Sequence, residues 1–157
     1  MGFLDSIADI IDEEEEYKKD KQNIKRLYLF EITFESGMKV VKIGKASGRS
    51  SVDRMMQIQR DFFNKCRTTF LCRIRRDRPI DKDLVFKYEA EMHKFFREYQ
   101  YKAPVEFDGH TECFAIPIED AVKVYEYLEA GNSLENEPAY QLPCQRGEVE
   151  DKDELPF

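Results

Sequence analysis

Residues 26–44 read as two β-strands joined by a tight turn, and this hairpin limits the folds available to the chain. Between residues 26 and 34 large apolar side chains recur at every second position, which is the period of a strand with one buried face. Ser36 and Gly37 form a turn signal, and residues 39–44 return as the second strand. We therefore expect an antiparallel sheet at the start of the folded domain.

The remaining elements predict an α+β fold. The elements expected in chain order are a helix capped by Ser51 and ending near residue 64, a strand over 68–74, the longest helix over 83–100, a short strand over 112–116, and a helix from Pro117 to just before Gly131. This order, β-β-α-β-α followed by a short strand and a helix, predicts a small domain with a three-stranded antiparallel sheet flanked by helices.

Segments of different character flank this domain. Residues 3–16 carry apolar side chains at helical spacing, which predicts an amphipathic helix whose apolar stripe docks on the domain. After Gly131 the composition turns polar and acidic, which is typical of a disordered tail. The predicted organisation is an acidic N-terminal helix over 1–21, a folded domain over 22–131, and a disordered acidic tail over 132–157.

Charge follows the same boundaries. Residues 1–21 carry three Lys/Arg and eight Asp/Glu, residues 22–105 carry nineteen against ten, and residues 106–157 carry three against fourteen. The net charges are therefore −5, +9 and −11. A basic domain between acidic ends indicates a surface that binds a polyanion such as DNA, although an ordinary dipolar surface has the same pattern.

Composition also bears on location. The sequence has no apolar run long enough to span a bilayer and no signal peptide, so we expect no membrane partner. The four cysteines lack metal-ligand spacing and read as reduced thiols. Both observations predict a cytoplasmic protein.

The candidate catalytic and metal-binding residues occur in one ordered series, namely Tyr28, Lys42-Ile43-Gly44, Arg54, Glu89, His93 and Glu112-Cys113-Phe114. Over roughly residues 26–116 this series resembles the GIY-YIG nuclease superfamily, and more closely its divergent branch common in phage genomes. The resemblance implies a metal-dependent DNA endonuclease encoded by a phage, acting in the cytoplasm of the host cell.

The resemblance also implies roles. Tyr28 would position or deprotonate the attacking water, Lys42 would bind phosphate or carry a proton, and Arg54 would contact the scissile phosphate. Glu89 would bind one Mg²⁺ or Mn²⁺, with His93 four residues later on the same helix face. From the residues alone, Tyr28 is equally a core aromatic, Arg54 a solvated arginine and His93 a structural hydrogen-bonding group.

Basic residues outside this series predict a rim that binds the DNA backbone without reading its sequence. The predicted rim consists of Lys45, Arg49, Arg73, Arg75, Arg76 and Arg78.

The last residues of the chain form a second motif, which resembles the C-terminal tip of bacterial single-stranded DNA-binding proteins. That tip recruits replication and repair enzymes, so the resemblance implies such enzymes as partners. A phenylalanine ring would fill an apolar pocket, and an acidic run would lie on a basic ridge. A solubilising acidic tail is the alternative. The residues of the tip are Asp151, Asp153, Glu154, Leu155, Pro156 and Phe157.

Two functions remain open at this point. The first is a DNA endonuclease that its tail recruits to host enzymes. The second is a catalytically inert adaptor or inhibitor that mimics the tail of single-stranded DNA-binding proteins. Ile58 favours the second, because many active members of the superfamily have a tyrosine or histidine one helical turn after the arginine. A DNA-binding module without cleavage is a third reading.

Overall fold

The computed structural model describes residues 3–145, and the side chains of residues 10–19 and 23–145. Within this range four strands form one antiparallel sheet in the order β3-β1-β2-β4. The strands are β1 (Lys25–Thr33), β2 (Lys39–Ser47), β3 (Leu71–Pro79) and β4 (Cys113–Phe114). The helices are α1 (Phe3–Asn23), α2 (Val52–Cys66), α3 (Lys82–Phe95) and α4 (Ile118–Glu129), with short 3₁₀ turns η1 (Arg97–Tyr99) and η2 (His110–Glu112).

The α+β class is confirmed, but the sheet has one strand more than predicted. The short strand expected near residue 113 joins the sheet as β4, where Val41 and Lys42 of β2 pair with Phe114 and Cys113. A segment of two residues gives little periodicity, so its sequence does not show that it pairs with the hairpin. The long helix predicted over 83–100 is also shorter, because it ends at Phe95 and continues as η1.

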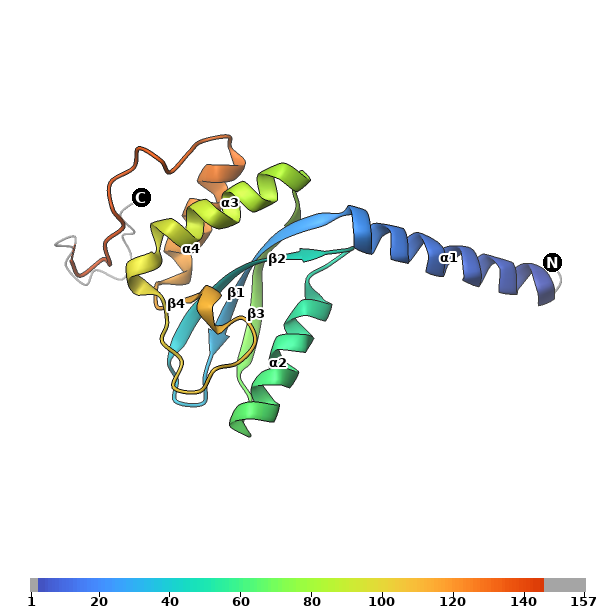
Figure 1. Cartoon of the computed structure of the whole chain (residues 1–157), viewed down its shortest axis with the longest axis horizontal. Helices are drawn as coiled ribbons and strands as arrows, with labels where there is room; N and C mark the ends of the chain where they lie inside the picture. Colours follow the sequence, from blue (N-terminus) through green and yellow to red (C-terminus); the bar gives the residue numbers. More distant parts are fainter. Residues whose placement is uncertain (1–2, 146–157) are drawn as a thin grey trace.

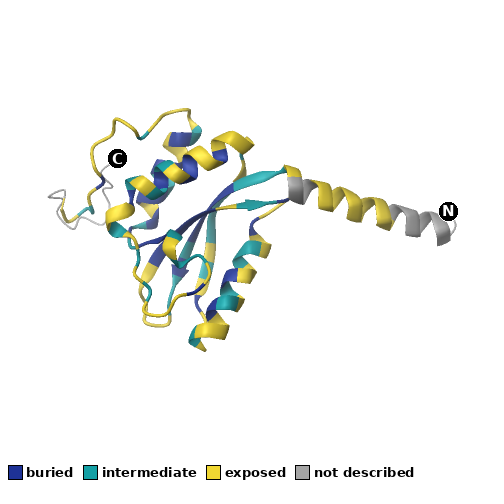
Figure 2. Cartoon of the chain, viewed as in Figure 1, coloured by how far each residue is buried: buried dark blue, intermediate teal, exposed yellow. Residues whose placement is uncertain are grey.

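Helices cover both faces of the sheet. α3 and α4 lie on one face and α2 lies on the other (Figure 1). β1 is a central strand, so Leu27 and Leu29 pack under α3 and α4 while Tyr28 and Phe30 pack under α2. Residues 27–30 are all buried, so the strand has two buried faces where the sequence predicted one, and Figure 2 shows β1 crossing the buried centre of the sheet.

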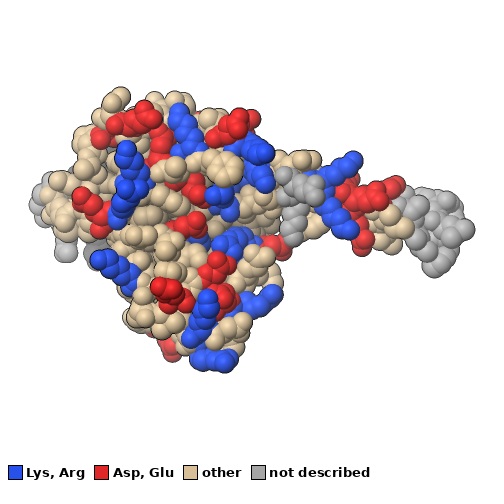
Figure 3. Space-filling model, viewed as in Figure 1, with Lys and Arg blue, Asp and Glu red and all other residues tan. Residues whose placement is uncertain are grey.

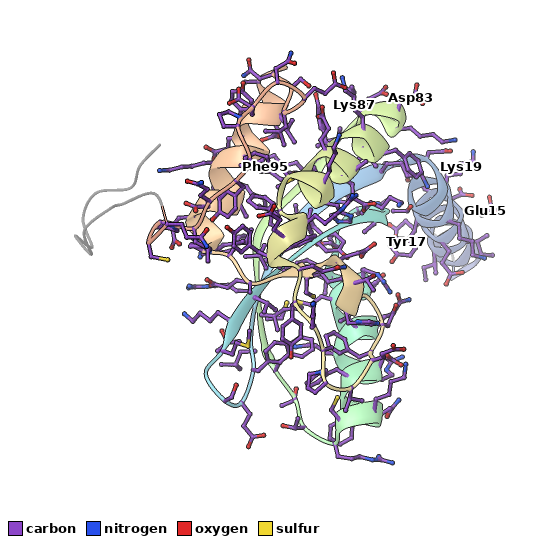
Figure 4. All side chains as sticks on the ribbon, turned by 60° about the vertical axis from the view of Figure 1, so that its left-hand side comes forward. Glu15, Tyr17, Lys19, Asp83, Lys87 and Phe95 are labelled. Carbon is purple, nitrogen blue, oxygen red and sulfur yellow. The ribbon has the colours of Figure 1, made fainter. Side chains whose placement is uncertain are left out.

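α1 does not dock on the domain along its length. It extends away from the sheet (Figure 1), and Ile10 and Ile11 are 57% and 50% exposed. Its described contact lies near its C-terminal end, where the Tyr17 hydroxyl donates to Asp53 Oδ2 at 3.0 Å. Tyr17 lies on the side of α1 that faces the domain (Figure 4). The predicted docking of the apolar stripe is therefore wrong for the side chains that the structure describes.

The predicted tail begins too early. Tyr140 is 4% exposed, its ring packs on Phe96 with centroids 4.8 Å apart, and its hydroxyl donates to buried Asp120. Leu134 and Leu142 pack against the same hydrophobic cluster. Residues 132–145 therefore belong to the folded domain, since one large aromatic ring anchors a segment whose composition alone predicts disorder. Residues 146–157 lie outside the described range.

Two further expectations concern cysteines and membranes. All four cysteines are free thiols, and burial raises the pKa of the Cys113 thiol to about 12. None of the helices in the described part of the chain is long and apolar enough to cross a bilayer.

Candidate functional site

The Lys42-Ile43-Gly44 segment of β2 lies at the centre of the candidate site. β4 pairs only with Val41 and Lys42, so beyond Lys42 this edge of β2 has no strand neighbour among the described residues. His93 of α3 occupies that edge, with its Nε2 2.7 Å from the Ile43 carbonyl oxygen. The carbonyl can only accept, so Nε2 carries the proton and Nδ1 is left as the acceptor of the neutral ring. The structural hydrogen bond expected for His93 therefore leaves one nitrogen available.

Gly44 makes room for Tyr28 on the neighbouring strand. The two residues are paired in the sheet, and a Cβ on Gly44 would lie 2.3 Å from the Tyr28 hydroxyl oxygen. Tyr28 has no exposed surface and stacks on Phe30 with centroids 3.9 Å apart. Its hydroxyl has no hydrogen-bond partner among the described residues. Tyr28 is thus a core aromatic whose hydroxyl still reaches the region of Lys42 and Arg54.

The charge state of Tyr28 follows from its burial. Burial raises the pKa of its phenol, while the nearby positive charges of Lys42 and Arg54 act in the opposite direction. The phenol is therefore neutral near pH 7, where it can donate a hydrogen bond but is a poor base.

Lys42 is fully buried and forms an ion pair with Glu112 of η2. Burial acts to lower the pKa of its ammonium group, but the interactions with Tyr28 and Glu112 outweigh burial and the pKa is raised. The ammonium group of Lys42 is therefore paired with Glu112. The raised pKa is opposite in direction to the depressed pKa that the predicted proton-carrying role needs.

Gly109 completes the enclosure of Lys42. It has a φ of +81°, and a Cβ there would lie 2.6 Å from Lys42 Cε. The left-handed backbone favours glycine, and a side chain there would displace the end of Lys42. The Asp108-Gly109 turn is therefore part of the site rather than only a connection.

Three potential metal ligands meet beside this lysine. One donor atom from each of Glu89, His93 and Glu112 lies within 4.8 Å of the others. Glu89 is 8% exposed; its Oε1 accepts from Lys45 Nζ at 3.1 Å, and its Oε2 is buried without a hydrogen-bond partner among the described residues. Two carboxylates, one with an unpaired buried oxygen, form a suitable donor set for Mg²⁺ or Mn²⁺.

Arg54 of α2 is close enough to Tyr28 to act on its pKa, and it binds Asp108 through two guanidinium nitrogens. Nη1 is 2.6 Å from Oδ2 and Nη2 is 3.3 Å from Oδ1. The hydrogen bond from Arg54 lowers the pKa of the Asp108 carboxyl, and the Asp108 backbone N–H donates to Asp61 Oδ2 at 2.6 Å. No pattern in the sequence indicates Asp108 as a partner, because 54 residues separate it from Arg54.

The start of α2, which positions Arg54, is held by Asp77 of β3. Asp77 Oδ2 accepts from the backbone N–H and the hydroxyl of Ser51 at 2.9 and 2.8 Å, while Arg26 Nε binds Oδ1 at 2.6 Å. Ser51 precedes the helix as predicted but its side chain makes no capping bond. The Ser51 hydroxyl instead donates a hydrogen bond to Asp77 of the sheet.

The predicted basic rim is not one surface. Lys45 contacts Glu89 of the site and Arg49 lies over the Tyr17 ring of α1, but the four arginines are on β3, at the opposite edge of the sheet from β4. Three of them are in ion pairs, Arg75 with Glu31, Arg76 with Glu126 and Arg78 with Glu129. Lysine, arginine and acidic side chains are accordingly interspersed on the face shown in Figure 3. The predicted partner-binding residues 151–157 lie outside the described range, so their role stays a prediction.

The family comparison corrects the resemblance drawn from the sequence. The T5orf172 domain, a phage-associated domain found in nuclease-like proteins, matches residues 25–129. It is a different family from the GIY-YIG nucleases, so the assignment to that superfamily is wrong. No curated protein and no solved structure shows significant similarity to the chain.

Proposed function

The chain belongs to the T5orf172 domain family, and from this premise we propose that it is a metal-dependent endonuclease acting on DNA phosphodiester bonds. The family itself gives the coarser statement, a phage-type function that is nuclease-related or involves contact with DNA. The finer proposal rests on the chemistry of the site, and one observation carries it. Glu89, His93 and Glu112 bring donor atoms within 4.8 Å of one another, although they come from α3 and from η2.

Glu89 and Glu112 would hold the cation through their carboxylates. The unpaired buried oxygen of Glu89 supports this role, because such an atom costs roughly 1–3 kcal/mol unless a partner satisfies it. When bound, Mg²⁺ or Mn²⁺ would supply Lewis-acid stabilisation of the charge that develops on the phosphate.

The other residues divide the remaining tasks. Arg54 offers a planar guanidinium that matches two phosphate oxygens. His93 donates through Nε2 to the Ile43 carbonyl, which fixes the ring and leaves Nδ1 to accept a proton from water. Tyr28 remains protonated and acts as a hydrogen-bond donor, and Lys42 orients Glu112 through their ion pair.

A second function has its own support. Arg54 pairs with Asp108, Lys42 with Glu112 and Lys45 with Glu89, so each of these three cations is neutralised inside the protein. This pairing favours an inert adaptor or inhibitor whose C-terminal residues bind bacterial enzymes that recognise single-stranded DNA-binding-protein tails.

Cleavage assays distinguish the two functions. The full chain is incubated with duplex, single-stranded and branched DNA in the presence of Mg²⁺ or Mn²⁺, alongside Glu89→Gln. The exposed Glu98 gives a matched control, Glu98→Gln, with the same chemical change outside the site. The nuclease proposal expects cleavage that falls about a hundredfold or more in Glu89→Gln only. Equal residual nicking by all three proteins would favour the inert adaptor.

A further inference from the structure

We propose that Asp108 is an internal substitute for phosphate at Arg54, so that the loop carrying it must release Arg54 before DNA binds. This inference rests on the proposed function, since it assigns Arg54 to a DNA phosphate. It adds a regulatory contact within the chain, formed by residues 100–112 between η1 and β4.

The geometry of the pair supports the substitution. A guanidinium offers parallel N–H groups that suit the two oxygens of a carboxylate or of a phosphate equally well. Asp108 uses both oxygens on Arg54, at 2.6 and 3.3 Å, and so takes the donors that a phosphate would need. DNA therefore competes with Asp108 for the same atoms.

The pair is also open enough to exchange. The Arg54 side chain is 27% exposed and that of Asp108 is 44% exposed, so water and ions reach both. Ion pairs of this exposure contribute little to stability, so opening of the contact requires little free energy. The pair of Lys42 and Glu112, whose lysine has no exposed surface, would not separate so readily.

The loop connects Arg54 to the candidate metal ligands. Gly109 packs against Lys42, and Glu112 follows in η2, where it contacts Lys42 and lies beside Glu89 and His93. On its other side the loop is held by Asp61, which accepts from the Asp108 backbone, and by the buried ring of Phe107. A shift of Asp108 away from Arg54 would therefore also move Gly109, the adjacent residue that packs against Lys42.

DNA binding measures the competition without requiring cleavage. Fluorescence anisotropy of a labelled DNA duplex is recorded in a Glu89→Gln background at low salt, with and without Asp108→Asn. Asparagine keeps the size of the side chain and the backbone hydrogen bond to Asp61 but removes the charge. We expect affinity to rise about tenfold, the scale of one charge-assisted hydrogen-bonded contact.

Two controls separate competition at Arg54 from a general loss of negative charge. Glu106→Gln makes the same charge change two residues away at an exposed position, and should raise affinity much less. In an Arg54→Ala background, Asp108→Asn should give no gain, because no guanidinium remains to be released.

Three results would overturn the inference. They are an unchanged affinity in Asp108→Asn, an equal gain in Glu106→Gln, or a gain that persists in Arg54→Ala. Absence of DNA binding by every variant would overturn it as well, because Asp108 would then exclude nothing. A protein that binds DNA as expected but cleaves none would contradict the proposed function and leave this inference standing.

Discussion

Gly44 and Tyr28 are paired across β2 and β1 so closely that the phenol hydroxyl occupies the space a side chain on Gly44 would fill. A Cβ at Gly44 would lie 2.3 Å from the hydroxyl oxygen and 2.5 Å from ring Cζ. At Gly44 β2 is paired with β1 alone, whereas β1 is held between β2 and β3, so relief of the contact would require β2 or the buried Tyr28 ring to shift. The glycine of the Lys-Ile-Gly segment is therefore explained by Tyr28.

The first prediction concerns this contact. Gly44→Ala should lower the free energy of unfolding by about 1–3 kcal/mol, because it overpacks a fully buried site. Chemical denaturation measures the change. Gly44→Ala should cost less in a Tyr28→Leu background than in wild type, because leucine lacks the ring and hydroxyl that a Cβ at residue 44 would meet. Additive losses in the double variant would show that the two side chains do not compete for space.

A second prediction separates stability from function at Tyr28. Its hydroxyl is buried without a described partner, so Tyr28→Phe should change the free energy of unfolding by less than about 1 kcal/mol, or raise it. Cleavage should nevertheless fall if the hydroxyl donates to a bound phosphate. A loss of stability without a loss of cleavage would assign the hydroxyl to the fold.

A third prediction concerns the segment that follows α4. Tyr140→Ala should cost about 3–5 kcal/mol, the range for removal of a large buried ring, with a corresponding fall in thermal midpoint. Gln141→Ala changes an exposed neighbour and should have little effect. A chain truncated after residue 131 should be less stable than the full chain, because it lacks the Tyr140 ring. Equal stability of the two chains would refute the packing of Tyr140.

A fourth prediction concerns pH. The hydrogen bond from Arg54 lowers the pKa of Asp108 in the folded protein. A carboxyl with a depressed folded-state pKa contributes stability above its unfolded pKa, near 3.9, and that contribution is lost as pH falls through the folded value. Wild type should therefore exceed Asp108→Asn in unfolding free energy at pH 7, and the difference should begin to fall below about pH 4 and vanish only below the lowered folded-state pKa. A difference that is constant with pH would mean that the charge of Asp108 does not stabilise the fold.

The sequence predicted local structure better than it predicted contacts between distant segments. The hairpin, α2 and α4 follow from periodicity, glycine and proline, which act over a few residues. Glu89 and His93 could be placed on one helix face for the same reason. Asp108 could not be recognised as the partner of Arg54, nor Tyr140 as a core residue, because these contacts exist only once the chain has folded.

The ion pairs of the predicted rim arginines could not be foreseen for a related physical reason. A cluster of arginines in the sequence does not reveal the acidic residues that will face it. On β3 the glutamates of α4 and Glu31 of β1 provide those partners, since Arg76 pairs with Glu126 and Arg78 with Glu129. The family assignment failed because short motifs in order are compatible with more than one family.

The last prediction concerns the ion pair between Lys42 and Glu112, whose two members differ in exposure. Lys42 has no exposed surface, whereas the Glu112 side chain is 32% exposed. Lys42→Met fills the same space with an apolar chain and leaves Glu112 able to turn to water, so unfolding free energy should change by less than about 1.5 kcal/mol. Glu112→Gln leaves a buried ammonium without its countercharge and should cost about 3–5 kcal/mol. Chemical denaturation of the two variants at neutral pH measures both values. Equal costs would mean that the pair acts as an ordinary surface contact. A larger cost for Lys42→Met would mean that Lys42 makes a stabilising contact besides its ion pair with Glu112.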